Sequence, residues 1–357
     1  MKVLMLSANL DLPEANLTAA LPELGANVTL VVEQNSPYQD VLRGFTGRVL
    51  HHTFPSRFNL GSIRWLRSLC KKEKVDIVHC FSNRALSNAV LAAIGTRIKI
   101  VAYRGTVGHV SRLDPSSWFA YLNPKVSKIV CVSEAVKKYL AGKGVDDGRL
   151  VRIYKGHDPK WYDGIMALPV EKFAIPEGSF TVCCTANMRY VKGVDVLIES
   201  MRFIPPESNV HLLLVGDVRD SAVHTTRQSS SMRERIHFTG FRHDAVAIMK
   251  GTDAFCMPSR YREGLPKSVL EAMACSLPVV ATNVGGLPEV VQNNKNGFIV
   301  NPDDPAALAA AICKLSADRA LAKRLGETGR RILSERFSFD ATLSQTFSLY
   351  RELLASQ

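Results

Sequence analysis

Residues 2–32 read KVLMLSANLDLPEANLTAALPELGANVTLVV, and they decide the fold class. Lys2–Leu6 and Val28–Val32 have the length and apolar character of buried strands, and Leu17–Leu24 between them suits a helix that ends at Gly25. A strand, a helix and a second strand in this order are typical of a parallel sheet that helices cover on both faces. The chain is therefore expected to be an α/β protein.

The alternation of strands and helices continues after this opening. Further strands are expected at Ile77–Cys80, Ile98–Tyr103 and Ile129–Val132, with helices near Ile63–Lys72 and Ala85–Ile94. Ser133 follows the last of these strands and is a natural N-cap for another helix. The first half of the chain thus predicts one doubly wound sheet.

A second series of strands and helices begins near residue 181. Residues 158–180, DPKWYDGIMALPVEKFAIPEGSF, are rich in proline and glycine and are interpreted as a linker. The strands expected beyond them are Thr181–Thr185, Val210–Val215, Ile236–Phe238, Ala254–Met257, Val279–Ala281 and Gly297–Val300. The expected helices are Val194–Met201, Ser268–Ala274 and Pro305–Leu315.

These two series predict two Rossmann-like, doubly wound parallel-sheet domains, at residues 1–160 and 161–338, that face each other across a cleft. Residues 339–357 form a last helix with no following strand, which we expect to pack back on the N-terminal domain. Ligands of doubly wound sheets bind beyond the carboxyl ends of the strands, so the cleft is the expected site.

The composition is that of a basic globular protein. Hydrophobic residues make up 46% of the 357 and charged residues 22%, and 45 basic against 33 acidic side chains give a net charge of +12. Such an excess attracts polyanions, so nucleic acid, anionic lipid headgroups and phosphorylated substrates are candidate partners. We find no recognisable nucleic-acid-binding module, so nucleic acid is not expected as a partner.

The cysteines and the N-terminus indicate a cytoplasmic protein. Cys131, Cys183, Cys184 and Cys256 lie in apolar runs, and no C-x-x-C occurs among the eight cysteines, so a reducing compartment fits best. The apolar part of residues 1–17 is too short for a signal peptide. No window approaches the roughly 18 apolar residues that a membrane span needs.

The strongest chemical signal is residues 259–271, SRYREGLPKSVLE. Glu263 and Glu271 lie on either side of a Gly-Leu-Pro-Lys turn that opens a helix, and Glu271 is expected about two helical turns further on, on the same face. The N–H groups and the positive dipole end of a helix start favour a phosphate, while carboxylates accept hydrogen bonds from sugar hydroxyls. The pattern suits a nucleotide-sugar; two glutamates without a ligand are the alternative.

The residues around this motif complete a recognisable pattern. It is followed by EAMACSLPVVATNVGGLPEVVQNNKNGFIVNPDD at 271–304 and preceded by the Asn187–Gly193 loop, Val215-Gly216-Asp217 and Phe238–Phe241. From Thr181 to Asp304 the chain resembles the C-terminal domain of glycosyltransferase family 4 (glycosyl transferases group 1), retaining enzymes of the GT-B fold. The first half resembles the family more loosely, through Ile77–His79, Val130–Ser133 and Lys155–Asp158.

The resemblance implies a glycosyltransferase of the hexosyltransferase class that uses a nucleotide-sugar donor, with UDP the expected nucleotide. It implies that Arg189 and Lys192 neutralise the donor diphosphate, that Glu263 holds a donor-sugar hydroxyl and that Glu271 binds the ribose. The other donor-binding positions that it implies are Gly216, Asp217, Phe241, Gly264, Leu265, Pro266 and Lys267. No cofactor and no metal are expected, because the basic pair and the helix dipole supply the positive charge.

The first half departs from the family pattern near the reacting sugar. The family often has a histidine after the fourth strand, whereas this chain has Arg104 there and His109 five residues later. Either His109 acts from the same loop, or Arg104 grips an anionic acceptor or the donor phosphate, or His109 is an ordinary loop residue. The family's asparagine before Gly156 is replaced by Lys155, which is expected to add positive charge near the cleft.

Residues 62–74, SIRWLRSLCKKEK, alternate apolar and basic side chains at helical spacing. Ile63, Leu66 and Leu69 form an apolar stripe that would cover a sheet, and the surrounding cations could face an anionic membrane. Family members often act on lipid-linked acceptors in bacterial surface polysaccharide or lipopolysaccharide assembly. A glycan or lipid-linked acceptor and a peripheral position on the inner face of the membrane are therefore expected.

Two other classes of protein remain as alternatives. A nucleotide-sugar epimerase of related fold would need an acid–base set in the cleft beyond the two glutamates. A non-catalytic basic binding protein is disfavoured by the intact Arg189, Lys192, Glu263 and Glu271. A nicotinamide dehydrogenase is disfavoured because no G-x-G-x-x-G follows a strand.

Overall fold

The computed structural model describes residues 1–355 and divides them into two compact units. The first unit comprises Met1–Gly156 together with the terminal helix from Phe339, and the second comprises His157–Ser338. The boundaries predicted from the sequence lay after residues 160 and 338, and the contact boundaries lie after Gly156 and Ser338.

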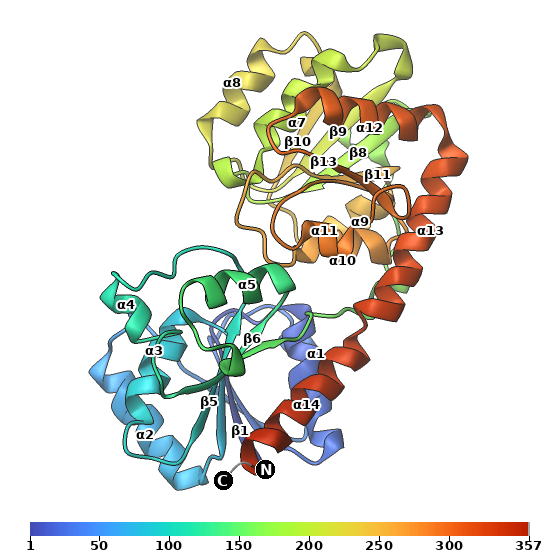
Figure 1. Ribbon diagram of the computed structural model, residues 1–357. Coiled ribbons are helices and arrows are strands. Elements are labelled where there is room, and N and C mark those ends of the chain that lie inside the picture. Colours follow the sequence, from blue (N-terminus) through green and yellow to red (C-terminus); the bar gives the residue numbers. More distant parts are fainter. Residues whose placement is uncertain (356–357) are drawn as a thin grey trace. The chain divides into compact units, whose positions relative to one another are not determined.

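A seven-stranded sheet forms the centre of the first unit, in the order β3-β2-β1-β4-β5-β6-β7 (Figure 1). All of its strand pairs are parallel. The strands are β1 (Lys2–Ser7), β2 (Asn27–Val32), β3 (Arg48–His51), β4 (Ile77–Cys80), β5 (Lys99–Arg104), β6 (Val126–Cys131) and β7 (Leu150–Arg152).

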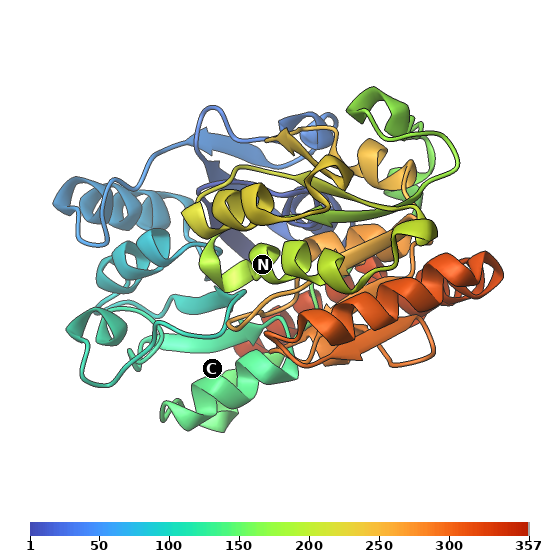
Figure 2. The same ribbon diagram turned by 90° about the horizontal axis from the view of Figure 1, so that it is seen from above.

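Helices cover both faces of this sheet. They are α1 (Leu12–Ala20), α2 (Leu60–Glu73), α3 (Asn83–Ala92), α4 (Pro115–Trp118), α5 (Glu134–Gly142) and α14 (Phe339–Ala355). The pair α2 and α3 lies side by side (Figure 1, Figure 2). Leu66 of α2 and Ala89 of α3 line one small cavity together with Val78 of β4. Neighbouring residues of a strand face opposite sides, so Ile77 instead joins the core formed with Tyr350 of α14.

The second unit has a six-stranded sheet in the order β10-β9-β8-β11-β12-β13, again with parallel pairs throughout. The strands are β8 (Phe180–Thr185), β9 (Val210–Val215), β10 (Ile236–Gly240), β11 (Ala254–Met257), β12 (Val279–Thr282) and β13 (Gly297–Val300). The helices are α6 (Lys160–Asp163), α7 (Val194–Ser200), α8 (Ser221–Ser229), α9 (Ala245–Lys250), α10 (Lys267–Ala274), α11 (Leu287–Val290), α12 (Pro305–Ala317) and α13 (Arg319–Arg336). The α/β class and the two Rossmann-like sheets predicted from the sequence are confirmed.

The segment interpreted as a linker is instead packed into the second unit. Tyr162 is 2% exposed, and its carbonyl oxygen and that of Ile165 both accept hydrogen bonds from Lys250 of α9. The Leu168 N–H bonds to the Ala247 carbonyl in the same helix. Proline and glycine indicated irregular backbone correctly, but apolar side chains and backbone hydrogen bonds fix this backbone against α9.

Candidate functional site

The strand order of the second unit reverses at one point, between β8 and β11. The chain continues toward opposite edges of the sheet after β8 and after β11, so the loops that follow these two strands diverge. Doubly wound sheets bind their ligands at such a point. The loop after β8 carries Arg189 and Lys192, and the loop after β11 carries Glu263. Three residues that were predicted to bind the donor are therefore carried by the two loops that follow β8 and β11.

Lys192 and Glu263 are in direct contact. The Lys192 ammonium lies 2.6 Å from Glu263 Oε1, and the Ser259 hydroxyl donates to the same oxygen at 2.5 Å. Glu263 is only 6% exposed. A Cβ at Gly285 would collide with the backbone carbonyl oxygen of Glu263, so the loop that carries Gly285 also packs directly on Glu263. The carboxylate is held in one place by an ion pair, a hydroxyl and close backbone packing.

Arg189 differs from Lys192 in that its side chain is exposed. Its Nε donates to the side-chain oxygen of Asn187 at 3.3 Å, and among residues 1–355 no ion pair involves it. A guanidinium in this situation keeps donors for a ligand, and its planar fork matches the oxygens of a phosphate.

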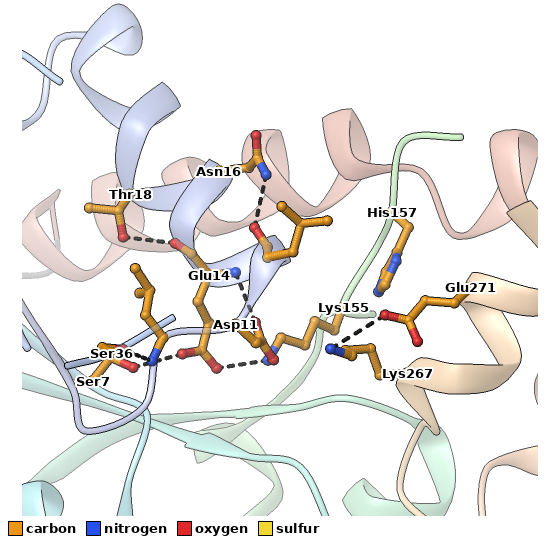
Figure 3. Close-up of polar contacts among 12 residues, drawn as sticks. Ser7, Asp11, Glu14, Asn16, Thr18, Ser36, Lys155, His157, Lys267 and Glu271 are labelled. Atoms are coloured by element: carbon orange, nitrogen blue, oxygen red, sulfur yellow. Dashed lines mark hydrogen bonds and ion pairs between the residues drawn. The ribbon is translucent and has the colours of Figure 1, made fainter. Parts of the chain in front are cut away.

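Glu271 lies in the second turn of α10, whereas Glu263 precedes that helix. The expectation that both glutamates share one helical face is wrong, because the residues from Glu263 to Pro266 are not helical and α10 starts at Lys267. Glu271 is 6% exposed, and Lys267 lies 3.3 Å from its Oε1, one turn earlier (Figure 3). Gly264 and Pro266 are buried and Leu265 is half-buried.

The loops after β9 and β10 lie next to the loop after β8. Asp217 accepts the Met188 N–H through its carbonyl at 2.9 Å, and the Gly216 N–H donates to the Gly240 carbonyl at 2.9 Å. Phe241 follows β10, is 62% exposed and contacts the His243 ring edge-on. Gly216 and Asp217, both predicted to bind the donor, thus border the Arg189 loop, whereas the contact of Phe241 is with His243.

One residue that the sequence analysis missed ties this site together. Arg260 follows β11, its side chain is 9% exposed, and it forms ion pairs with Asp195 at 2.7 Å and with Asp303 at 2.6 Å. The hydrogen bonds to Asp195, together with those to Asp303, raise the pKa of Arg260 above its ordinary value. The sequence carries no local signal for it, because its partners are far away along the chain.

In the first unit, Arg104 is 3% exposed and holds its own loop. Its Nε donates to the Thr106 carbonyl at 2.9 Å, its Nη2 donates to the Gly108 carbonyl, and its guanidinium lies 4.8 Å from the centre of the Tyr121 ring. This arrangement contradicts a free guanidinium that grips an acceptor or a phosphate, because Arg104 is buried against the backbone.

His109 sits at the exposed end of the loop that Arg104 holds, with a left-handed φ of 61°. The next residue is fixed on both sides, because the Val110 N–H and carbonyl both bond to the Tyr139 hydroxyl, at 3.0 and 3.1 Å. The imidazole is thus carried on an ordered loop beyond β5.

Lys155 does not add free positive charge. Its ammonium lies between Asp11 and Glu14, 2.7 Å from Glu14 Oε1, and Ser7 donates to the other oxygen of Glu14 at 2.8 Å (Figure 3). Burial raises the pKa of Glu14, and the Lys155 ammonium opposes that rise. Burial alone lowers the pKa of Lys155, but the carboxylates of Glu14 and Asp11 raise it well above its ordinary value. The expectation of added charge is wrong, since two acids neutralise this lysine.

Helix α2 buries one side and exposes its cations, as an amphipathic helix on a sheet does. Leu66 and Cys70 are buried, whereas Ile63 and Leu69 of the predicted stripe are half-buried. The basic residues Arg64, Arg67, Lys71, Lys72 and Lys74 are exposed. Within residues 1–355, no helix is both long and apolar enough to cross a membrane, and no three His, Cys, Asp or Glu residues are grouped to hold a metal ion.

Comparison with protein families accounts for most of the chain. Residues 15–161 match Glycosyltransferase Family 4, and residues 169–332 match Glycosyl transferases group 1.

Similar curated proteins include bacterial glycosyltransferases and glycosyltransferases of Methanocaldococcus jannaschii. N-acetyl-alpha-D-glucosaminyl L-malate synthase of Bacillus anthracis is 25% identical over 83% of this chain and 80% of its own length. The capsular polysaccharide biosynthesis glycosyltransferase CapM of Staphylococcus aureus is 26% identical over 85% of each chain. The Escherichia coli UDP-Gal:alpha-D-GlcNAc-diphosphoundecaprenol alpha-1,3-galactosyltransferase is 23% identical over 84% of this chain and 83% of its own length.

Solved structures share the fold over the whole chain. A glycosyltransferase from Rickettsia africae ESF-5 matches with a TM-score of 0.83 and 23% identity, over 100% of this chain and 99% of its own. Anabaena Alr3699/HepE in complex with UDP-glucose matches with a TM-score of 0.81 and 22% identity, over 100% of both chains. Two family matches that follow one another along the chain, two parallel Rossmann-like sheets and these structural neighbours agree: the chain belongs to glycosyltransferase family 4 and is a glycosyltransferase of the GT-B fold.

Proposed function

We propose that this glycosyltransferase moves a sugar from a UDP-sugar to a glycan or lipid-linked acceptor, with retention of anomeric configuration, in bacterial surface polysaccharide or lipopolysaccharide assembly. The observation that carries the proposal is the exposed Arg189 beside the Lys192–Glu263 pair, beyond the carboxyl ends of β8 and β11. Two cations and one oriented carboxylate at this position suit a donor that has a diphosphate and sugar hydroxyls.

Each residue has a separate part in this proposal. Arg189 and Lys192 stabilise the negative charge that builds up on the leaving diphosphate. Glu263 accepts a hydrogen bond from a donor-sugar hydroxyl, which it can do because Lys192 and Ser259 fix its carboxylate. Glu271 accepts hydrogen bonds from the ribose, and Lys267 orients it from the preceding turn. The N–H groups at the start of α10 face a phosphate.

Retention is proposed to follow front-face transfer, in which the departing phosphate helps to deprotonate the acceptor hydroxyl. The bond from the anomeric carbon to the diphosphate oxygen breaks, the acceptor oxygen forms its bond on the same face, and the hydroxyl proton goes to the phosphate. Proton NMR of the first product distinguishes the anomers, and an inverted product would exclude this mechanism.

The donor nucleotide is proposed to be UDP because the similar structure of HepE is a complex with UDP-glucose and the E. coli relative is named for UDP-Gal. Thermal-shift measurements with UDP, GDP and ADP test this choice, since only a ligand of the folded protein stabilises it. Stabilisation by UDP alone, lost in Glu271→Ala and kept in the exposed control Glu207→Ala, is the expected result. A shift with none of the nucleotides favours a non-catalytic binding role instead.

No metal is proposed to take part, because Arg189, Lys192 and the start of α10 supply the positive charge at the diphosphate. The prediction is that exhaustive treatment with EDTA leaves the turnover rate unchanged and that added Mg²⁺ or Mn²⁺ does not raise it. Activity that EDTA abolishes and Mn²⁺ restores would contradict this part of the proposal.

A membrane position is proposed for the first unit, on the inner face of the bilayer. Five large apolar side chains are exposed on two neighbouring segments, at residues 58–60 and 113–119, and we call them the apolar patch: Phe58, Leu60, Leu113, Trp118 and Phe119. Phe58 and Phe119 join the two segments with ring centres 4.8 Å apart. Apolar side chains next to the exposed cations of α2, which begins at Leu60, suit an anionic lipid surface.

Sedimentation with vesicles tests the membrane position. Vesicles that contain anionic lipid should retain the protein, and neutral vesicles should not. Leu113→Ser with Trp118→Ser should abolish retention, while Met166→Ser, an exposed apolar residue of the second unit, should keep it. Equal behaviour with both kinds of vesicle removes this part of the proposal.

A further inference from the structure

Arg260, whose side chain is 9% exposed, lies beside the loop that carries Arg189 and Lys192, and it contacts that loop twice. Its backbone N–H donates to the Val191 carbonyl at 2.9 Å, and its Nη1 donates to the Tyr190 carbonyl at 3.0 Å. Its guanidinium also lies over the Tyr190 ring, 4.2 Å from the centre. The main chain and the side chain of one residue thus hold the Tyr190–Lys192 turn.

Arg260 also joins this loop to two other segments. Asp195, in the first turn of α7, receives both Nη1 and Nη2 at 2.7 Å, and Asp303, before α12, receives Nε at 2.6 Å. A two-pronged carboxylate contact of this kind fixes both direction and distance. The loop after β8 is therefore fastened to the start of the following helix and to a loop that is distant in sequence.

The backbone leaves little freedom for another arrangement. Gly193 ends the Tyr190–Lys192 turn with a left-handed φ of 61°, and a Cβ there would collide with the Pro258 carbonyl oxygen. The Tyr190 carbonyl accepts both the Gly193 N–H at 3.1 Å and Arg260 Nη1. Loss of the guanidinium would therefore release the turn at the point where it closes.

Arg260 is not itself available to the donor. Four hydrogen bonds and a ring contact engage its guanidinium, and two carboxylates neutralise it. Arg189, by contrast, is exposed and forms no ion pair within residues 1–355. We infer that Arg260 is a positioning residue, which fixes the Tyr190–Lys192 turn so that Arg189 and Lys192 meet the donor diphosphate. The inference rests on the proposed phosphate-binding role of those two residues.

Arg260→Lys tests this inference, because lysine keeps the charge but cannot form the fork. Hydrogen exchange of the 189–193 amides should become faster, and the affinity for UDP, measured by calorimetry, should fall about tenfold. Asp303→Asn removes one partner on the exposed side and should give a smaller loss. Arg202→Lys, which changes an exposed arginine paired with Glu199 in the same unit, is the matched control and should change neither reading.

A double-mutant cycle separates positioning from general stability. If Arg260 acts through Arg189 and Lys192, Arg260→Lys should weaken UDP binding by less than about twofold once both have been changed to alanine. A lower thermal midpoint with wild-type exchange at 189–193 and wild-type UDP affinity would overturn the inference, and so would fully additive losses. If the alanine changes leave UDP affinity intact, the phosphate role fails, and the exchange rates still decide whether Arg260 orders the loop.

Discussion

The two sheets reverse their strand order in the same way, between β1 and β4 in the first unit and between β8 and β11 in the second, yet the charges beyond those strands are used differently. In the first unit, Lys155 is enclosed between Asp11 and Glu14, so a cation and two acids satisfy one another. In the second unit, Arg260 forms ion pairs with Asp195 and Asp303, and Arg189 stays exposed. The same kind of sheet thus carries a neutralised cluster of charges in the first unit and an exposed cation that can bind a ligand in the second.

The largest effect is expected from breaking the cluster of the first unit. Lys155→Met leaves the buried Glu14 carboxylate without its cation and should lower the free energy of unfolding by about 3–5 kcal/mol. Denaturant unfolding in a Trp161→Phe background measures it, because Trp65 and Trp118 then report the first unit alone. Adding Glu14→Gln and Asp11→Asn should restore most of the loss. A single variant within about 1 kcal/mol of the wild type would contradict a structural role for the cluster.

The second effect concerns the exposed cation of the second unit. Arg189→Ala should lower kcat/KM by about 100- to 1000-fold, because it removes a donor that meets the charge developing in the transition state. The unfolding midpoint should stay unchanged, since the side chain is exposed. Arg202→Ala is the control and should keep full activity. Full turnover in Arg189→Ala would contradict the proposal that Arg189 binds the donor diphosphate.

The third effect is a dependence of stability on pH in the first unit. His79 is 1% exposed with Nδ1 2.6 Å from the Tyr350 hydroxyl, and burial lowers its pKa to about 3. The unfolded chain binds a proton here near pH 6.5 and the folded unit does not, so this stability is complete above pH 6.5 and falls as the pH drops toward 3. Between pH 6.5 and 5 the loss should be about 2 kcal/mol.

The same Trp161→Phe background measures this slope. His79→Gln should flatten it, whereas His211→Gln should not, although burial, helped by His237 and Arg235, also lowers the pKa of His211, to about 4. The reason is that His211 belongs to the second unit. An unchanged slope in His79→Gln would show that other groups cause the acid loss of stability.

The smallest effect is expected at the loop of His109. Arg104→Lys removes the guanidinium contacts to the Thr106 and Gly108 carbonyls and should cost about 1–2 kcal/mol of unfolding free energy. Amides of residues 105–110 should exchange faster. Activity that falls in Arg104→Lys and equally in His109→Ala, without a further loss in the double variant, would indicate that Arg104 acts by holding His109. Additive losses would separate the two residues.

Several elements could be predicted within a residue or two from the sequence. The apolar runs at Ile77–Cys80, Val210–Val215, Ala254–Met257 and Gly297–Val300 are strands with the predicted bounds. Ile77–Cys80, Val210–Val215 and Ala254–Met257 are inner strands of a parallel sheet and are buried throughout, which makes their sequence unambiguous. Gly297–Val300 is an edge strand, which its apolar run and the motif around it still identified. The edge strands β3 and β7 were not predicted, because short, half-exposed strands have weak periodicity. The long helix α13 was also missed, although its buried residues follow helical spacing.

Part of the candidate site could likewise be predicted from the sequence, and part could not. Residues Arg189, Lys192, Glu263 and Glu271 were named from their motifs, and the sheet brings the loops of the first three together. Arg260 was missed although it belongs to the quoted motif, because its role depends on Asp195, 65 residues earlier, and on Asp303, 43 residues later.

The sequence by itself determined the fold class, the two strand–helix series and the family, because the periodicity of apolar residues and the spacing of motifs are local properties. Only the tertiary structure decided which charges are free. Four cations look alike in the sequence but differ in the structure. Arg104 holds a loop, and Lys155 is neutralised by two acids. Arg189 is exposed, and Arg260 joins three segments. The physical reason is that burial and the partner across the fold set the availability of a charge, and both depend on residues that are far apart along the chain.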